Sequence, residues 1–236
     1  MHAPLVLDLP TRIFHWAFVL LFTAAFGIAQ FVDDDAAAFG WHMVLGLTLA
    51  IAVALRVLWG FMGSRHARFR SFALHPRALA GYLRDTLLRR DRPMASHNPA
   101  SSWAALVMMG CALALAATGL ARAAGRGGDF VEEVHEAAAT LLALTALAHV
   151  AGVAMHGLRH GDGIAWSMVH GRKQQVDASE GIGSAHVLAG LFFLLYVIGS
   201  FVVLAQGFDP RARTLQLGGA VLHLGEAGDS HDRDDH

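Results

Sequence analysis

Six histidines lie within or at the ends of long apolar segments of the chain, where an ionisable side chain is costly and usually serves a function. They are His15, His42, His135, His149, His156 and His186. Fourteen residues separate His135 from His149, which places both imidazoles on nearly the same face of a helix, about 21 Å apart along its axis. His156 follows on the same stripe, so the helical face alone does not choose between His149 and His156.

Depth in a membrane decides which histidines can face one another from different helices. Depth is counted inward from the outer boundary of the membrane, with a helical rise of about 1.5 Å per residue. On this count His42 and His135 both lie at the boundary itself. His15 lies roughly 24 Å inward, His149 roughly 22 Å and His156 roughly 33 Å. The sequence therefore predicts two interhelical pairs, His42 with His135 and His15 with His149, about 20 Å apart.

Two facing imidazoles in an apolar bundle can supply both axial ligands of a haem iron. Because the protein fills both axial positions, such a haem carries electrons and has no open position for O₂. Two pairs at two depths would hold two haems, so that electrons could cross the membrane in two steps. Arg56, in the inner half of the second apolar segment, needs either an anionic partner such as a haem propionate or a route to the lipid headgroups.

Five apolar segments are long enough to carry these histidines across a membrane, which takes about 20 residues as a helix. We expect spans at about residues 13–31, 42–62, 101–120, 135–157 and 184–206. The composition agrees, because 55% of the 236 residues are hydrophobic and 16% are charged, which excludes a disordered or nucleic-acid-binding chain. A single cysteine excludes a disulfide framework and cysteine-ligated metal sites.

Charges in the loops predict the orientation, because short cytoplasmic loops retain arginine and lysine. Residues 63–99 are rich in arginine, whereas the first loop carries Asp33, Asp34 and Asp35 and no cation. We therefore expect a multi-pass protein of the bacterial inner (cytoplasmic) membrane, with a cytoplasmic N-terminus and a periplasmic C-terminus. Within the arginine-rich loop, residues 75–90 have the spacing of a short amphipathic helix lying on the cytoplasmic surface.

Several stretches of the sequence together resemble one family, the prokaryotic dihaem cytochrome b561 family. It is related to the b-type cytochrome subunits of nickel–iron hydrogenase and formate dehydrogenase. The stretches are Asp-Leu-Pro-Thr-Arg-Ile-Phe-His-Trp at 8–16, Leu-Gly after His42, Arg-Val-Leu-Trp-Gly-Phe-Met-Gly-Ser-Arg-His-Ala-Arg-Phe at 56–69, His-Asn-Pro at 97–99, Val-His-Glu at 134–136 and Leu-Ala-His-Val-Ala-Gly at 147–152. The resemblance implies two b haems held by the first, second and fourth spans. It also implies electron transfer between the quinone pool and a periplasmic partner, such as a c-type cytochrome or a dehydrogenase subunit.

The expected fold is therefore an all-α integral membrane protein. A four-helix transmembrane bundle holding two haems would occupy residues 1–175, a fifth transmembrane helix 176–206 and a polar periplasmic tail 207–236. Lipid, quinone and a periplasmic redox protein are the expected partners, with His156 as the candidate quinone contact beside the inner haem. A homodimer is compatible with the sequence, and a nucleic-acid partner is not expected.

Two other classes of protein could use membrane histidines. A proton or solute transporter with a histidine relay and no haem is disfavoured because Glu136 is the only carboxylate within the spans. A zinc or copper enzyme is disfavoured because no carboxylate completes either pair. The remaining features are expected to be structural: His66 and His75 would contact headgroups, Cys111 would fill the core, and Gly46, Gly110 and Gly119 would allow close helix approach.

Overall fold

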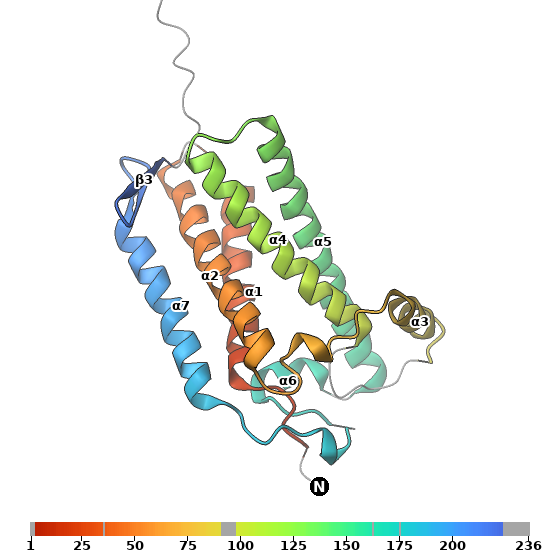
Figure 1. Ribbon diagram of the computed structural model, residues 1–236. Coiled ribbons are helices and arrows are strands. Elements are labelled where there is room, and N and C mark those ends of the chain that lie inside the picture. The colour runs from red at the N-terminus through yellow and green to blue at the C-terminus, as the bar shows by residue number, and fades with distance from the viewer. Residues whose placement is uncertain (1–2, 35, 91–97, 162, 175, 224–236) are drawn as a thin grey trace, which may run out of the picture.

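Five long helices dominate the computed structural model, which describes residues 3–34, 36–90, 98–161, 163–174 and 176–223 (Figure 1). They are α1 (Leu9–Phe31), α2 (Gly40–Met62), α4 (Pro99–Ala123), α5 (Asp129–His160) and α7 (Val187–Gly207). Each is long and apolar enough to cross a membrane, which confirms the five predicted spans. α5 begins six residues earlier than predicted. Asp129 and Glu132 stabilise its first turn, because their negative charges lie at the positive end of the helix dipole.

The shorter elements lie at the two ends of the bundle. They are the helices η1 (Ala37–Phe39), η2 (Phe69–Ser71), α3 (Pro76–Leu87), α6 (Ile164–His170) and η3 (Ala178–Glu180), and the strands β1 (Phe208–Asp209), β2 (Thr214–Leu217) and β3 (Ala220–His223). α3 confirms the amphipathic helix predicted in the arginine-rich loop. It lies with α6 at the end where α1 begins, which we call the N-terminal end, while β3 lies at the opposite, far end (Figure 1).

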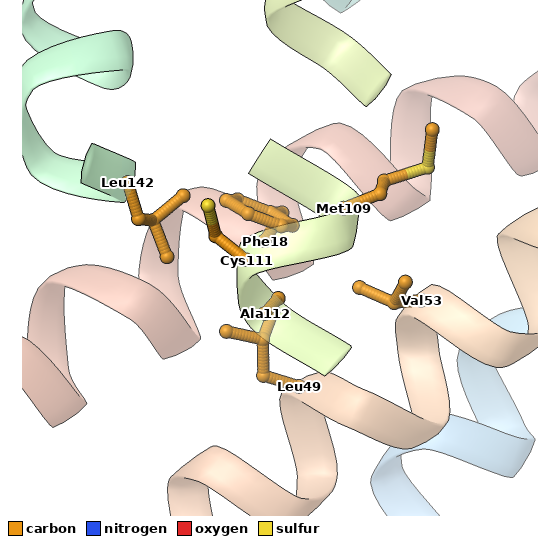
Figure 2. Close-up of a cluster of buried hydrophobic side chains, with 7 residues drawn as sticks. All are labelled: Phe18, Leu49, Val53, Met109, Cys111, Ala112 and Leu142. Atoms are coloured by element: carbon orange, nitrogen blue, oxygen red, sulfur yellow. The ribbon is translucent and has the colours of Figure 1, made fainter. Parts of the chain in front are cut away.

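A four-helix bundle forms because α1 packs on α2, α4 packs on α5, and α2 joins the two pairs through α4. The core between them contains side chains from all four helices (Figure 2). These are Phe18, Leu49, Val53, Met109, Cys111, Ala112 and Leu142. The fifth helix, α7, packs outside the bundle on α1 and α2, and its Gly190 leaves room for Leu9. The predicted fold is thus confirmed, and Cys111 is a core residue as expected.

Three helices at the N-terminal end begin with a capping side chain followed closely by proline. Asp8 accepts a hydrogen bond from the Thr11 backbone N–H of α1 at 2.9 Å, and Asn98 accepts one from Ser101 of α4 at 2.7 Å. His75 caps α3 in the same way through Nδ1 and is exposed, so its predicted contact with headgroups stays a prediction. Such caps satisfy N–H groups that have no partner within the helix.

The chain after α7 forms a small antiparallel sheet that the sequence reasoning did not foresee. β1, β2 and β3 pair in order, and the turn between β2 and β3 is Gly218-Gly219, both with positive φ. A Gly-Gly pair between two short runs of strand-forming residues is a hairpin signal that could have been used. Leu215 is fully buried against the far end of α2 and α7, so residues 208–223 are packed on the bundle.

Candidate functional site

His42 and His135 face each other at the far end of the bundle, from the first turn of α2 and the second turn of α5. Their ring centroids are 6.2 Å apart and the rings are inclined by 59°. The Nδ1 of His42 lies 2.9 Å from the carbonyl oxygen of Ala25 on α1, and the Nδ1 of His135 lies 2.8 Å from Thr118 Oγ1 on α4. All four helices of the bundle therefore orient this one pair of imidazoles.

The geometry of this pair fits an iron held between the two rings. Two imidazoles on opposite sides of one metal, each with a nitrogen about 2 Å from it, place their centroids about 6 Å apart. The Nδ1 atoms donate to protein oxygens, which leaves Nε2 as the ring nitrogen that could bind a metal. Metal-binding histidines in proteins usually have this arrangement, with one nitrogen on the metal and the other hydrogen-bonded.

The glycines singled out in the sequence differ in their surroundings. A Cβ added at Gly119 would lie 3.7 Å from His135 Cε1, an ordinary contact distance, so α4 approaches α5 closely there as expected. A Cβ added at Gly46, a turn beyond His42, would meet no atom within 4 Å, and neither would one at the exposed Gly110. The expectation that Gly46 and Gly110 allow close helix contact is therefore wrong, because the space beside them is open.

The second predicted pair, His15 on α1 and His149 on α5, lies toward the N-terminal end. The two side chains are both partly buried and lie within electrostatic range of each other. His15 also packs edge-on against Trp16, with ring centroids 5.4 Å apart, and the Trp16 indole N–H donates to the carbonyl of Met168 at 3.1 Å. No ring contact joins the two histidines among the described residues, so this pairing stays a prediction.

An apolar layer lies between the two histidine pairs along the bundle, and its side chains are those drawn in Figure 2. Leu142 lies seven residues from both His135 and His149 on α5, and its side chain is fully buried. Phe18, from the turn after His15, and Leu49 from α2 belong to the same cluster. Water is excluded from this layer, so charge at one pair is poorly screened from charge at the other.

Arg56 is buried within the N-terminal end of the bundle. Its side chain is 3% exposed, its Nη2 donates to the carbonyl of Ala67 at 3.0 Å, and its guanidinium lies over the rings of Phe14 and Phe69. The alternative in which Arg56 reaches the lipid headgroups is therefore wrong. Among the described residues, Nη1 is buried with no hydrogen-bond partner, so one donor of this cation is open to an anionic group.

Asp8 is a buried carboxylate that interacts electrostatically with Arg56, and the sequence analysis assigned it no role. It is 1% exposed and accepts hydrogen bonds from the Thr11 backbone and from the Trp59 indole, each at 2.9 Å. Burial raises the pKa of Asp8, but the hydrogen bonds that the carboxylate accepts outweigh burial and hold the pKa below its ordinary value. Asp8 followed by Leu-Pro is the helix-start signal that could have identified it.

The other histidines lie outside the two pairs. His156 is buried near the end of α5, with its ring 4.4 Å from that of His160. His186 precedes α7 and packs edge-on against Trp59. His66 is 3% exposed, and its Nε2 lies 2.7 Å from the carbonyl oxygen of Glu180, so the prediction that it contacts headgroups is wrong.

No cluster in the described part of the chain brings three or more His, Cys, Asp or Glu side chains together as a protein-held metal ion requires. A haem needs only two protein ligands, because the macrocycle supplies four nitrogens. Each histidine pair supplies that number of ligands.

Comparison with known proteins agrees with this chemistry. The family model for prokaryotic cytochrome b561 matches residues 6–171, and the chain belongs to that family. Neither a curated protein nor a solved structure matches it. Family membership and the five membrane-spanning helices define a multi-pass bacterial membrane protein for transmembrane electron transfer with b-type haem. α7 and the terminal sheet lie outside the matched residues.

Proposed function

We propose that the chain binds two b haems, one between His42 and His135 and one between His15 and His149, and carries electrons between a quinone and a periplasmic redox partner. The observation that carries this proposal is the facing pair His42 and His135, with its 6.2 Å ring separation and both Nδ1 atoms engaged. The partner would be a c-type cytochrome or a dehydrogenase subunit, as the family resemblance implies.

Haem supplies reversible one-electron chemistry when it is bound. The four histidines would hold the two irons, and Arg56 would donate from Nη1 to a propionate, because this donor is buried and has no partner among the described residues. Leu142 and Phe18 would keep the region between the two centres dry. His156, buried at the N-terminal end beyond His149, would donate a hydrogen bond to a quinone headgroup.

The orientation follows from the loop charges. The N-terminal end carries the arginines of residues 63–90. The far end carries Asp33, Asp34 and the acidic first turn of α5. Because arginine-rich short loops stay in the cytoplasm, we place the N-terminal end there and the pair His42 and His135 near the periplasm. A quinone at His156 would then exchange protons with the cytoplasmic side.

Haem content and reduced-minus-oxidised spectra of the purified chain test this proposal. We expect two b haems in the parent protein, one in His135→Ala and one in His149→Ala. His75→Ala is the matched control, because this exposed histidine caps α3 and lies outside both pairs, and it should keep two haems. A parent protein without haem, or either pair variant with two haems, would contradict the proposal.

A further inference from the structure

Thr118 on α4 makes a contact that the histidine ligands alone do not explain. Its hydroxyl lies 2.8 Å from the carbonyl oxygen of Ala114 and 2.8 Å from Nδ1 of His135. A threonine hydroxyl has one proton, and Ala114 can only accept it, so Oγ1 accepts the N–H of His135. The ring of His135 is thereby held as the tautomer with Nε2 free for a metal.

We propose that Thr118 is a positioning residue that lowers the reduction potential of the haem held by His42 and His135, making the two haem centres unequal. This inference rests on the proposed function. An acceptor on Nδ1 raises the basicity of an imidazole ligand, and a more basic ligand stabilises the more positive, oxidised iron. His42 has the same kind of support from the Ala25 carbonyl. Both ligands of this centre are thus electron-rich.

The second pair lacks this support. Within the part of the chain that the structure describes, neither His15 nor His149 has a ring nitrogen hydrogen-bonded to a protein acceptor. A less basic ligand stabilises the oxidised iron less. This difference favours a higher potential at the second centre, so at equilibrium the electron should reside on the haem toward the N-terminal end.

Spectroelectrochemical titration of purified protein with both haems bound tests the role of Thr118. Thr118→Val keeps the shape of the side chain and removes the acceptor, whereas Thr118→Ser keeps it. We expect one of the two midpoints to rise in Thr118→Val, so that the ratio of reduced to oxidised iron at a fixed potential increases about tenfold, or about 59 mV. Thr118→Ser should match the parent.

Ser200→Ala is the control variant. Ser200 makes the same kind of bond to a helix carbonyl, from Oγ to Tyr196 at 2.7 Å, but lies on α7, outside the four-helix bundle. Its midpoints should equal those of the parent. Unchanged midpoints in Thr118→Val, or an equal shift in Thr118→Ser, would overturn the inference. Loss of only this haem in Thr118→Val, with both retained in Thr118→Ser, would support it.

A second measurement does not depend on any Thr118 variant. His149→Ala should keep only the centre at His42, and His135→Ala only the centre at His15, so each midpoint can be measured alone. We expect the lower midpoint in His149→Ala, and the opposite order would overturn the inference. Haem content is measured first, so a parent protein without haem refutes the proposed function itself, and the inference falls with it.

Discussion

Replacing Asp8 tests whether one buried carboxylate joins the start of α1 to the end of α2. Asp8→Ala removes the acceptor for the Thr11 backbone and for the Trp59 indole, and also the negative charge that Arg56 experiences. Loss of a helix cap costs about 1 kcal/mol. A buried indole N–H without a partner costs about 1–3 kcal/mol. The two together predict a loss of roughly 2–4 kcal/mol in the free energy of unfolding.

Asp8→Asn should have an intermediate effect, because one amide oxygen can cap α1 or accept from Trp59 but cannot do both. Asp177→Ala is the control: this exposed aspartate also caps a backbone N–H, that of Ser179 at 2.8 Å, but on a surface turn. Heat unfolding in detergent, followed by circular dichroism, measures the differences. At roughly 2–4 °C per kcal/mol, Asp8→Ala should unfold about 4–16 °C below the parent. If it unfolds with the parent, the reasoning is refuted.

The depressed pKa of Asp8 also predicts a pH dependence. A carboxyl whose pKa is lower in the folded than in the unfolded chain stabilises the fold fully above its ordinary pKa of 3.8, and this stability is lost as the pH falls through the folded value. The difference in unfolding temperature between the parent and Asp8→Asn should therefore shrink below about pH 4. A difference that stays constant between about pH 3 and pH 6 would contradict this.

Two further substitutions test the packing. Leu142→Ala should cost about 2–5 kcal/mol because it opens a cavity in the layer between the histidine pairs, whereas Leu147→Ala, on a side chain 67% exposed, should change stability little in the same heat-unfolding assay. Gly190→Ala should lower the unfolding temperature, because its Cβ would lie 2.6 Å from Leu9 Cγ and push α7 away from α1. Gly199→Ala, with nothing within 4 Å, should not, and equal effects of the two would show that α7 is not docked through Gly190.

Much of the candidate site could be predicted because its ligands lie on regular helices. The spacing of His135 and His149 fixes the helix face that they share and the distance between them. The helical rise per residue then fixes which histidines on other helices lie at the same depth in the membrane. The structure places His42 beside His135 as this reasoning expected. The geometry of helices in a membrane is simple enough for such distances to be counted along the chain.

Predictions failed where a side chain's surroundings come from distant parts of the chain. His66 was expected to contact headgroups, and a route to the headgroups was one of two alternatives for Arg56. The structure buries both, His66 against Glu180 and Arg56 against Phe14, Phe69 and the Ala67 carbonyl. Nothing in their local sequence specifies that burial, because it depends on the packing of α1 and of the segment before α7.

The sequence alone determined the five long helices, and local capping signals mark where α1, α3 and α4 start. A run of about 20 apolar residues must satisfy its own backbone hydrogen bonds in lipid, and Asp8, His75 and Asn98 mark the starts through caps within three residues. Only the tertiary structure decided which atoms hold each imidazole. Ala25 and Thr118 are each 17 residues from the histidine they orient and lie on another helix, so their approach is set by how the helices pack.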